Sequence, residues 1–124
     1  MPHRFLGRSI SGPFTIPSGI VMTDAASIGR LARGIPELGV LTTKSIGLKQ
    51  REGYKEPILA EPSPGTFINA VGLANPGVEV FAEKLARQRI PEDRFLLASI
   101  FGNAPGEIRS IAGRLKDRSE EHNV

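Results

Sequence analysis

The feature that most constrains this chain is the alternation of short apolar runs with longer segments whose apolar residues recur every three or four positions. The apolar runs Phe14–Ile16, Gly39–Thr43 and Phe95–Ile100 are each followed, directly or after an excursion, by a segment with the spacing of one helical face. Strands alternating with helices favour a parallel sheet covered by helices. The sequence therefore predicts an α/β fold.

The starts of the helices can be predicted individually. Thr23 or Asp24 can cap a first helix. Asn75-Pro76 predicts the start of a second, with asparagine as the cap and proline in the first helical position. A third follows Gly102–Pro105, and the charged residues Lys116–His122 beyond it are expected to be exposed or frayed. The residues expected to face the core are Ile28, Leu31, Ala32 and Ile35; Val78, Phe81, Ala82, Leu85 and Ala86; and Ile108, Ile111, Ala112 and Leu115.

Two small antiparallel units are expected beside the main strands. Arg4–Thr15 predicts a short amino-terminal hairpin, broken near Ser11–Pro13. After the second main strand, a charged loop leads into the small strands Ile58–Glu61 and Thr66–Ala70, joined by Pro62–Gly65. This pair of strands is an excursion from the α/β alternation.

The number of main strands limits the architecture. A closed (β/α)₈ barrel needs roughly 250 residues, so 124 residues correspond to about half of one. The chain also ends on a predicted helix, where another strand should follow. The expected fold is the amino-terminal part of a (β/α)₈ barrel, in which residues 1–124 form the amino-terminal half of a single domain.

Composition disfavours several classes of function. The net charge is +3, the basic residues are scattered and aromatic residues are only 6% of the chain, which disfavours nucleic-acid binding. The chain has no cysteine, and His3 and His122 lie near opposite ends, so no metal site is expected. No apolar stretch is long enough to span a bilayer. The expectation is a cytoplasmic protein that does not bind membranes.

Polar residues stand at or just beyond the ends of the three main predicted strands. They are Ser18-Gly19, Lys44-Ser45 and Ser99. In parallel α/β folds the carboxyl ends of the strands form the ligand-binding face. Glycine lets a ligand approach the backbone, and Lys44 places a positive charge at the mouth of a buried strand. The coincidence of three such sites predicts a ligand-binding face.

Each of these features also has a purely structural interpretation. Ser18-Gly19 after proline is typical of an ordinary turn, and a lysine at the end of a strand commonly reaches solvent. Ser99 can bond a neighbouring carbonyl. The segment Asn69–Asn75 can be a loop that enters a helix. From pattern alone, the chain is the ligand-binding half of an α/β protein.

Two longer motifs carry a resemblance to a known family. The segments "TKSIGLKQREG" at Thr43–Gly53 and "NAVGLANPG" at Asn69–Gly77 resemble dihydroorotate dehydrogenase, the FMN enzyme of pyrimidine synthesis. So do "PSG" at Pro17–Gly19 and "ASIFG" at Ala98–Gly102, and the resemblance covers nearly the whole chain. Without a membrane-anchoring helix, the chain is most similar to the soluble class. Within that class it resembles the catalytic subunit that pairs with an electron-transfer flavoprotein carrying FAD and an iron–sulfur cluster.

The resemblance implies roles for individual residues. Contacts to FMN are implied for Ser18, Gly19, Lys44, Ser45 and Ser99. At the position of Ser99 relatives often carry asparagine. Contacts to dihydroorotate or orotate are implied for Lys44, Asn69, Ala70, Val71, Gly72 and Leu73, with Asn69 bonding the pyrimidine.

The implied reaction removes two hydrogens from dihydroorotate. A base takes a proton from one ring carbon, the flavin takes hydride from the next, and protein groups orient and polarise the substrate. Lys44 would stabilise negative charge on the reduced flavin and on orotate. In the family a cysteine or serine base follows the fourth barrel strand, so no residue of Met1–Val124 is assigned as the base. The chain alone is therefore expected to be inactive, and the resemblance implies a homodimer.

Two other interpretations stay open. A flavin oxidoreductase similar to dihydropyrimidine dehydrogenase would share the cofactor residues, although the segment Asn69–Asn75 favours dihydroorotate as substrate. A non-catalytic half-barrel that acts as a binding module would need neither flavin nor turnover. Flavin content and turnover discriminate among the three.

Overall fold

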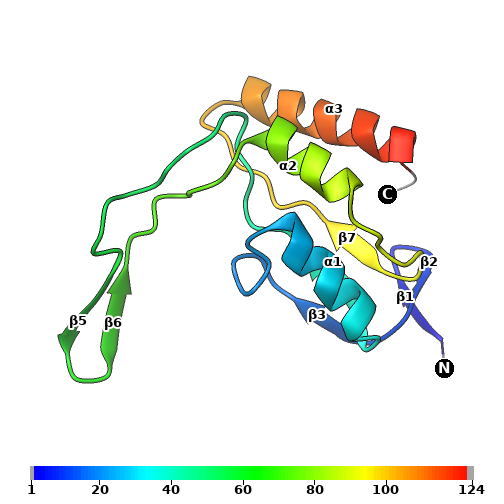
Figure 1. Ribbon diagram of the computed structural model, residues 1–124, viewed down its shortest axis with the longest axis horizontal. Coiled ribbons are helices and arrows are strands. Elements are labelled where there is room, and N and C mark those ends of the chain that lie inside the picture. Colours follow the sequence, from blue (N-terminus) through cyan, green and yellow to red (C-terminus); the bar gives the residue numbers. More distant parts are fainter. Residues whose placement is uncertain (1, 123–124) are drawn as a thin grey trace.

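The computed structural model describes residues 2–122, with side chains described for residues 2–118. At its centre is a three-stranded parallel sheet in the order β3-β4-β7 (Figure 1). The strands are β3 (Phe14–Ile16), β4 (Leu38–Thr42) and β7 (Phe95–Leu97). The predicted α/β fold with parallel main strands is confirmed in this part of the chain.

Three helices cover the sheet: α1 (Ala25–Gly34), α2 (Val78–Ala86) and α3 (Pro105–His122). α2 lies between the other two helices and packs against both (Figure 1). The core forms between the helices and β4, because the apolar face of each helix is removed from water there. Its buried members are Met22, Ala25, Ile28, Ala32, Leu41, Ile46, Val78, Phe81, Leu85 and Ile111.

The first helix begins where the sequence predicts. Asp24 is the N-cap, and its carboxylate accepts a hydrogen bond of 2.8 Å from the backbone N–H of Ser27. Ile28 and Ala32 are buried as expected. The expectation for Ile35 is wrong, because this residue lies just beyond the last helical turn and is exposed.

The second helix begins two residues later than the sequence predicts. Asn75 does not cap it and Pro76 is not in its first turn, because Gly77 is the N-cap and α2 begins at Val78. The side chain of Asn75 is buried, and its oxygen accepts from the backbone N–H groups of Gly47 in an earlier loop and of Gly77, the N-cap itself. The predicted buried face of α2 is confirmed, with Ala86 half-buried at its end.

The third helix continues through the charged residues that were expected to fray. Lys116, Asp117 and Arg118 are exposed as expected, but they are helical, and the side chains of residues 119–122 lie outside the described set. Ala112 is exposed rather than buried. α3 packs mainly along α2, and Ala112 lies on the side of α3 that faces away from α2. Within residues 2–122 no helix is both long and apolar enough to cross a membrane.

The amino-terminal hairpin is shorter than predicted. β1 (His3–Phe5) and β2 (Arg8–Ile10) pair in antiparallel fashion and turn at Leu6-Gly7, where both residues have positive φ. Ser11–Pro13 therefore is not the turn but the link from β2 to β3. The hairpin packs beside β7, with the rings of Phe5 and Phe95 5.0 Å apart between centroids.

The third main strand is also shorter than predicted. β7 ends at Leu97 and all three of its residues are half-buried, although the apolar run continues to Ile100. Pairing with the segment after β4 resumes at a single bridge between Ile46 and Ile100. Within the described residues β7 is an edge strand, with β4 on one side.

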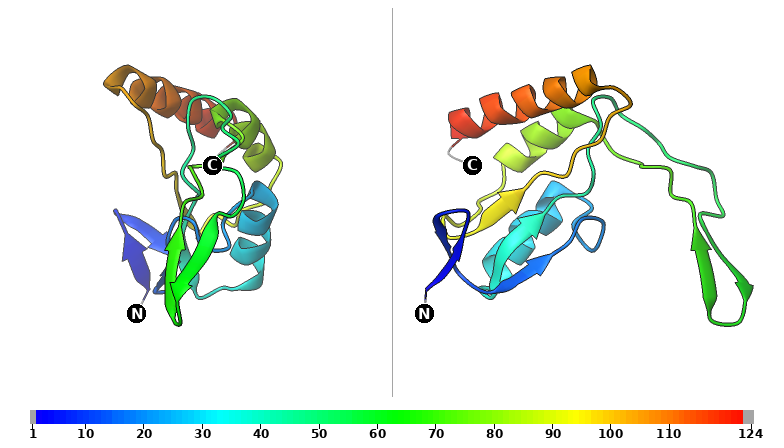
Figure 2. Two further views of the ribbon diagram at one scale, coloured as in Figure 1. Left: turned by 90° about the vertical axis from the view of Figure 1, so that its left-hand side faces the viewer. Right: turned by 180° about the vertical axis from the view of Figure 1, so that it is seen from behind.

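The excursion forms an arm that stands clear of the rest of the molecule (Figures 1 and 2). Its strands are β5 (Leu59–Ser63) and β6 (Thr66–Asn69), which pair with each other. The turn is confined to Pro64-Gly65, so β5 runs two residues further than predicted. Every residue of both strands is exposed. We call residues 55–70 the arm.

Candidate functional site at the carboxyl ends of the strands

The carboxyl ends of the three parallel strands lie at one edge of the sheet, and polar residues follow each of them. Ser18 and Gly19 follow β3, Lys44 and Ser45 follow β4, and Ser99 follows β7. Because β4 is the central strand, the residues that follow it have the other two sets as neighbours. The structure thus places at this edge all five residues for which FMN contacts were predicted.

A hydrogen bond joins Ser45 and Ser99. Their hydroxyl oxygens lie 2.9 Å apart, and both side chains are half-buried. The backbone N–H of Ser99 donates to the hydroxyl of buried Thr43 at 3.0 Å, and the N–H of Ile46 donates to the carbonyl of Ser99 at 2.9 Å. Whichever serine accepts the shared bond keeps its own proton, so the pair can offer a donor to a ligand.

Lys44 is fixed at its backbone, while its charge has no ion-pair partner among the described side chains. Its N–H donates to the carbonyl of Met22 at 3.2 Å, which ties the end of β4 to the loop after β3. The side chain is half-buried, and among the described side chains it has no carboxylate partner within ion-pair distance. Its ammonium group can therefore bind an anionic ligand.

The loop after β3 is strained. Val21 has a φ of +48°, a left-handed conformation that costs a β-branched residue about 1–2 kcal/mol. Val21 and Ile20 are exposed, whereas the next residue, Met22, is fully buried in the core. The anchoring of Met22 holds the loop in this shape. Backbone strain that the surrounding structure maintains is typical of ligand-binding loops.

The predicted substrate segment Asn69–Leu73 is not brought to the strand ends. Asn69 is the last residue of β6 in the arm, and only Gly72 of the five residues is not exposed. The backbone of this segment bonds to the other side of the arm and its base: the N–H of Ala70 donates to Ile58, and the carbonyl of Val71 accepts from Tyr54. The views in Figures 1 and 2 agree that the arm points away from the sheet.

Sequence reasoning missed two residues at this edge. Thr43 is fully buried, and its hydroxyl fixes the backbone of Ser99. Asn75, predicted as a helix cap, accepts a hydrogen bond of 3.1 Å from the backbone N–H of Gly47. The hydroxyl of Thr43 at the end of an apolar run was a usable signal for a polar contact. Nothing in the local sequence indicated the partner of Asn75, which lies 28 positions earlier.

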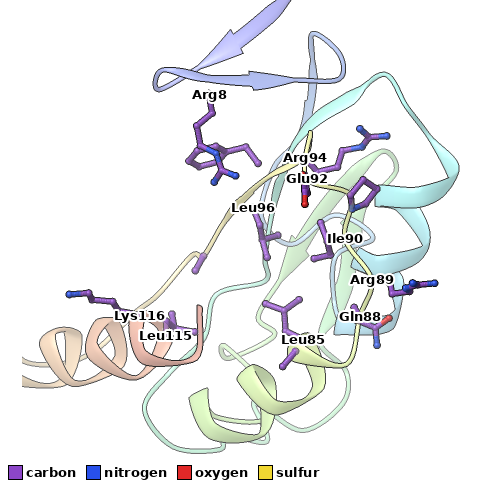
Figure 3. A pocket seen from close by; sticks show the side chains of 14 residues that line it. Arg8, Leu85, Gln88, Arg89, Ile90, Glu92, Arg94, Leu96, Leu115 and Lys116 are labelled. Atoms are coloured by element: carbon purple, nitrogen blue, oxygen red, sulfur yellow. The ribbon is translucent and has the colours of Figure 1, made fainter. Parts of the chain in front are cut away.

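A separate cavity lies elsewhere on the molecule. Its volume is about 610 Å³, and it lies among the end of α2, the connection to β7, β7 itself and α3 (Figure 3). Leu85, Ile90, Leu96 and Leu115 contribute apolar side chains, and Arg8 lies at its margin. None of the predicted cofactor or substrate residues lines it. We therefore assign the candidate site to the strand ends and not to this cavity.

Comparison with known proteins finds relatives that match nearly the whole chain, the strand-end residues included. The family model described as "Dihydroorotate dehydrogenase" matches residues 1–121. The catalytic subunit of dihydroorotate dehydrogenase B (NAD(+)) from Methanothermobacter thermautotrophicus is 35% identical over 111 residues, which cover 90% of this chain and 35% of the relative. The subunits of the same name from Methanocaldococcus jannaschii and Pyrococcus abyssi are 34% and 36% identical over 89% and 88% of the chain, and over 36% and 35% of their own lengths.

The chain thus spans about a third of the length of these relatives. The matched residues include the strand ends after β3, β4 and β7 and both long motifs, Thr43–Gly53 and Asn69–Gly77. The family resemblance stated from the sequence is therefore confirmed: this chain belongs to the dihydroorotate dehydrogenase family.

Proposed function

We propose that this chain forms the amino-terminal part of an FMN-dependent enzyme that oxidises dihydroorotate to orotate in de novo pyrimidine biosynthesis. Because the chain spans about a third of its relatives, the activity is proposed for a longer protein. In that protein, residues 1–124 would be one part of a single FMN-binding (β/α)₈ barrel. The observation that carries the proposal is the half-buried Lys44 at the mouth of β4, which has no carboxylate partner among the described side chains, in a chain of this family.

The strand-end residues fit the chemistry of a flavin. An isoalloxazine ring presents carbonyl and ring-nitrogen acceptors and an N–H donor at its edge. The hydroxyls of Ser45 and Ser99 and the ammonium group of Lys44 supply donors at one edge of the sheet. Ser18 and Gly19 would contact the flavin from the loop after β3. When bound, FMN would supply the acceptor for hydride that no side chain provides.

Lys44 has the central electrostatic role in this proposal. Its positive charge would stabilise the carboxylate of the substrate and the negative charge that develops during oxidation. Its half-buried position strengthens that interaction, because fewer waters screen the charge. No residue of the chain is assigned as the general base, and the proposal places the base in the remaining part of the protein.

The segment Asn69–Leu73 would bind the pyrimidine through the amide of Asn69 and backbone groups. This role requires the arm to lie closer to the strand ends than it does in Figure 1. The two strands of the arm pair with each other and stand clear of the sheet (Figure 2), so the arm could bend toward the site from its base. We propose that the rest of the protein and the bound ligands place the arm over the site.

Partner subunits belong to the same proposal. The relatives bear the name of catalytic subunits of an NAD(+)-linked enzyme. We propose that the complete protein forms a homodimer in the cytoplasm and passes electrons to a second subunit carrying FAD and an iron–sulfur cluster. Co-purification with such a subunit, and its loss on high-salt washing, would test this part independently of the flavin site.

The cofactor and the substrate can be tested together. We expect the complete protein to show the visible absorbance of bound FMN, and this absorbance to bleach without oxygen on addition of dihydroorotate. Dihydrouracil is the matched control, because it lacks the carboxylate that Lys44 would bind. No flavin absorbance after reconstitution with FMN would contradict the cofactor. Bleaching by dihydrouracil in preference to dihydroorotate would instead indicate an enzyme similar to dihydropyrimidine dehydrogenase.

A further inference from the structure

One buried side chain connects the two long motifs of the chain. Asn75 is 8% exposed, and its Oδ1 accepts hydrogen bonds from the backbone N–H groups of Gly47 at 3.1 Å and Gly77 at 2.9 Å. Its Nδ2 donates to the carbonyl of Leu73 at 2.9 Å. Gly47 lies three residues after Lys44, and Leu73 is the last residue of the proposed pyrimidine-binding segment. A single amide therefore contacts both motifs.

These bonds require a carboxamide of this length. Two N–H donors converge on one atom of the side chain, which fixes that atom as the oxygen, and the carbonyl of Leu73 then meets the NH₂ group. An aspartate would keep the acceptor but lose the donor. A leucine of similar shape would lose all three bonds and leave two buried N–H groups without a partner. A glutamine would be one methylene too long for the same positions.

The backbone around Asn75 is packed too closely to shift independently. Asn75 and Arg51 exchange two backbone hydrogen bonds of 2.8 and 2.9 Å. A Cβ atom on Gly77 would lie 2.8 Å from the nitrogen of Gln50, and one on Gly53 would lie 2.4 Å from the carbonyl oxygen of Val71. The stretches 47–54 and 71–77 therefore run as one closely apposed pair, which forms the base of the arm.

Consecutive hydrogen bonds join the paired stretches 47–54 and 71–77 to the carboxyl ends of the strands. The N–H of Ile46 donates to Ser99, and the N–H of the next residue, Gly47, donates to Asn75. At the other end, Leu73 has a φ of +55°, and its carbonyl is held by the amide of Asn75. The backbone at Leu73, where the proposed substrate segment joins the base of the arm, is thus tied through one side chain to the stretch that follows Ser45.

We propose that Asn75 is a positioning residue that fixes the end of the pyrimidine-binding segment Asn69–Leu73, at Leu73, relative to Lys44 and the flavin, so that the arm reaches the site from a defined base. It touches neither ligand, and it acts by shaping the left-handed turn at Leu73 from an anchor on Gly47. The inference rests on the proposed function, because it presupposes that FMN binds at the strand ends and that the pyrimidine binds at Asn69–Leu73. It predicts that disturbing Asn75 weakens pyrimidine binding while flavin binding is retained.

The test uses the complete enzyme with Asn75→Asp and Asn75→Leu. FMN content is read from visible absorbance, and orotate affinity from the perturbation of the flavin spectrum during titration. We expect Asn75→Asp, which keeps both accepted bonds, to weaken orotate binding and raise the KM for dihydroorotate at least about tenfold, with FMN content within twofold of wild type. Asn75→Leu should weaken orotate binding further.

Gln88→Glu is the matched control. This variant makes the same change from amide to acid. The Nε2 of Gln88 also donates to a backbone carbonyl, that of Lys84, and Gln88 lies just after the end of α2, away from the strand ends. It should leave orotate affinity within twofold of wild type. If Asn75→Leu does not fold, Asn75→Asp decides the matter.

The outcomes separate this inference from the proposed function. Wild-type enzyme that binds no FMN or is not reduced by dihydroorotate would overturn the proposed function. Active wild-type enzyme whose Asn75→Asp variant binds orotate normally would overturn the positioning role alone. Parallel loss of FMN, orotate binding and thermal stability in Asn75→Asp would also overturn it, because it would show a general structural role.

Discussion

At the scale of single residues, Lys44 differs from the other lysines of the chain. It is half-buried at the end of a buried strand, whereas Lys49, Lys55, Lys84 and Lys116 are exposed. We predict that Lys44→Ala in the complete enzyme lowers the rate of flavin reduction by dihydroorotate at least about tenfold, as expected when a charge that stabilises the reacting centre is lost. Rapid mixing without oxygen measures this step.

Lys84→Ala is the matched control for Lys44→Ala. Lys84 lies on the exposed side of α2, so its removal takes away the same charge at a distance from the strand ends. The control should reduce the flavin at the wild-type rate. Equal rates in the Lys44→Ala variant and in wild type would show that the lysine merely reaches solvent, which is the structural interpretation of its position.

Asn69 carries a second prediction at this scale. We expect Asn69→Ala to weaken orotate binding more than FMN binding, because the residue belongs to the arm and lies away from the serine pair at the sheet edge. Parallel titrations with orotate and with FMN measure the two affinities. Equal loss of both ligands would mean that the segment Asn69–Leu73 has a structural role only.

At the scale of elements, α1 is stabilised by its N-cap. The bond from the N–H of Ser27 lowers the pKa of the Asp24 carboxyl below its usual range, and the nearby side chain of Ser27 acts in the same direction. We predict that Asp24→Ala destabilises the protein by about 1 kcal/mol near neutral pH. This corresponds to a fall in Tm of about 2–4 °C in a protein of 150–250 residues and to a smaller fall in a longer one.

The pH dependence of this effect follows from the direction of the shift. A carboxylate whose pKa is lower in the folded state contributes stability above its unfolded-state pKa and loses that contribution as the pH falls through the folded-state value. The difference between wild type and Asp24→Asn, which keeps an acceptor without the charge, should therefore shrink in acid. A difference that grows as the pH falls, in thermal unfolding followed by circular dichroism, would contradict this account.

At the scale of the whole molecule, both outer strands of the sheet, β3 and β7, have no strand partner on their outer side within the described residues. Each therefore presents unpaired backbone groups along one edge. α3 packs along α2, and a cavity lined by apolar and charged side chains, Leu96 and Leu115 among the apolar ones, lies beside it. Unpaired edges beside apolar surface favour association with another chain.

We therefore predict that the isolated 124-residue chain is marginally stable and self-associates. Size-exclusion chromatography over a range of concentrations should show oligomers or aggregates, and thermal melting should show a low, broad transition. A dye-reduction assay should detect no oxidation of dihydroorotate, because the chain has no cysteine and no assigned base. A monomeric chain that melts cooperatively and oxidises dihydroorotate would contradict both the edge argument and the proposed division of the active site.

The sequence by itself determined the local structure and the family. The apolar run of β4, the cap at Asp24 and the buried face of α2 depend on residues close in sequence, and the structure confirms them. The family followed from the motifs Thr43–Gly53 and Asn69–Gly77, and the comparisons confirm it. Local patterns of this kind can be read because hydrophobic spacing and capping act within a few residues.

Only the tertiary structure decided features that depend on partners distant in sequence. Asn75 has the sequence signature of a helix cap, and its oxygen does accept from Gly77 two residues on, but it also binds a backbone N–H 28 positions away, and α2 begins only at Val78. β7 stops at Leu97 although the apolar run continues, and Ala112 is exposed because of where α2 lies. A local signal offers a residue several satisfactory conformations. The conformation adopted is the one in which contacts with distant residues leave the fewest buried polar atoms without a hydrogen bond and the least apolar surface in water.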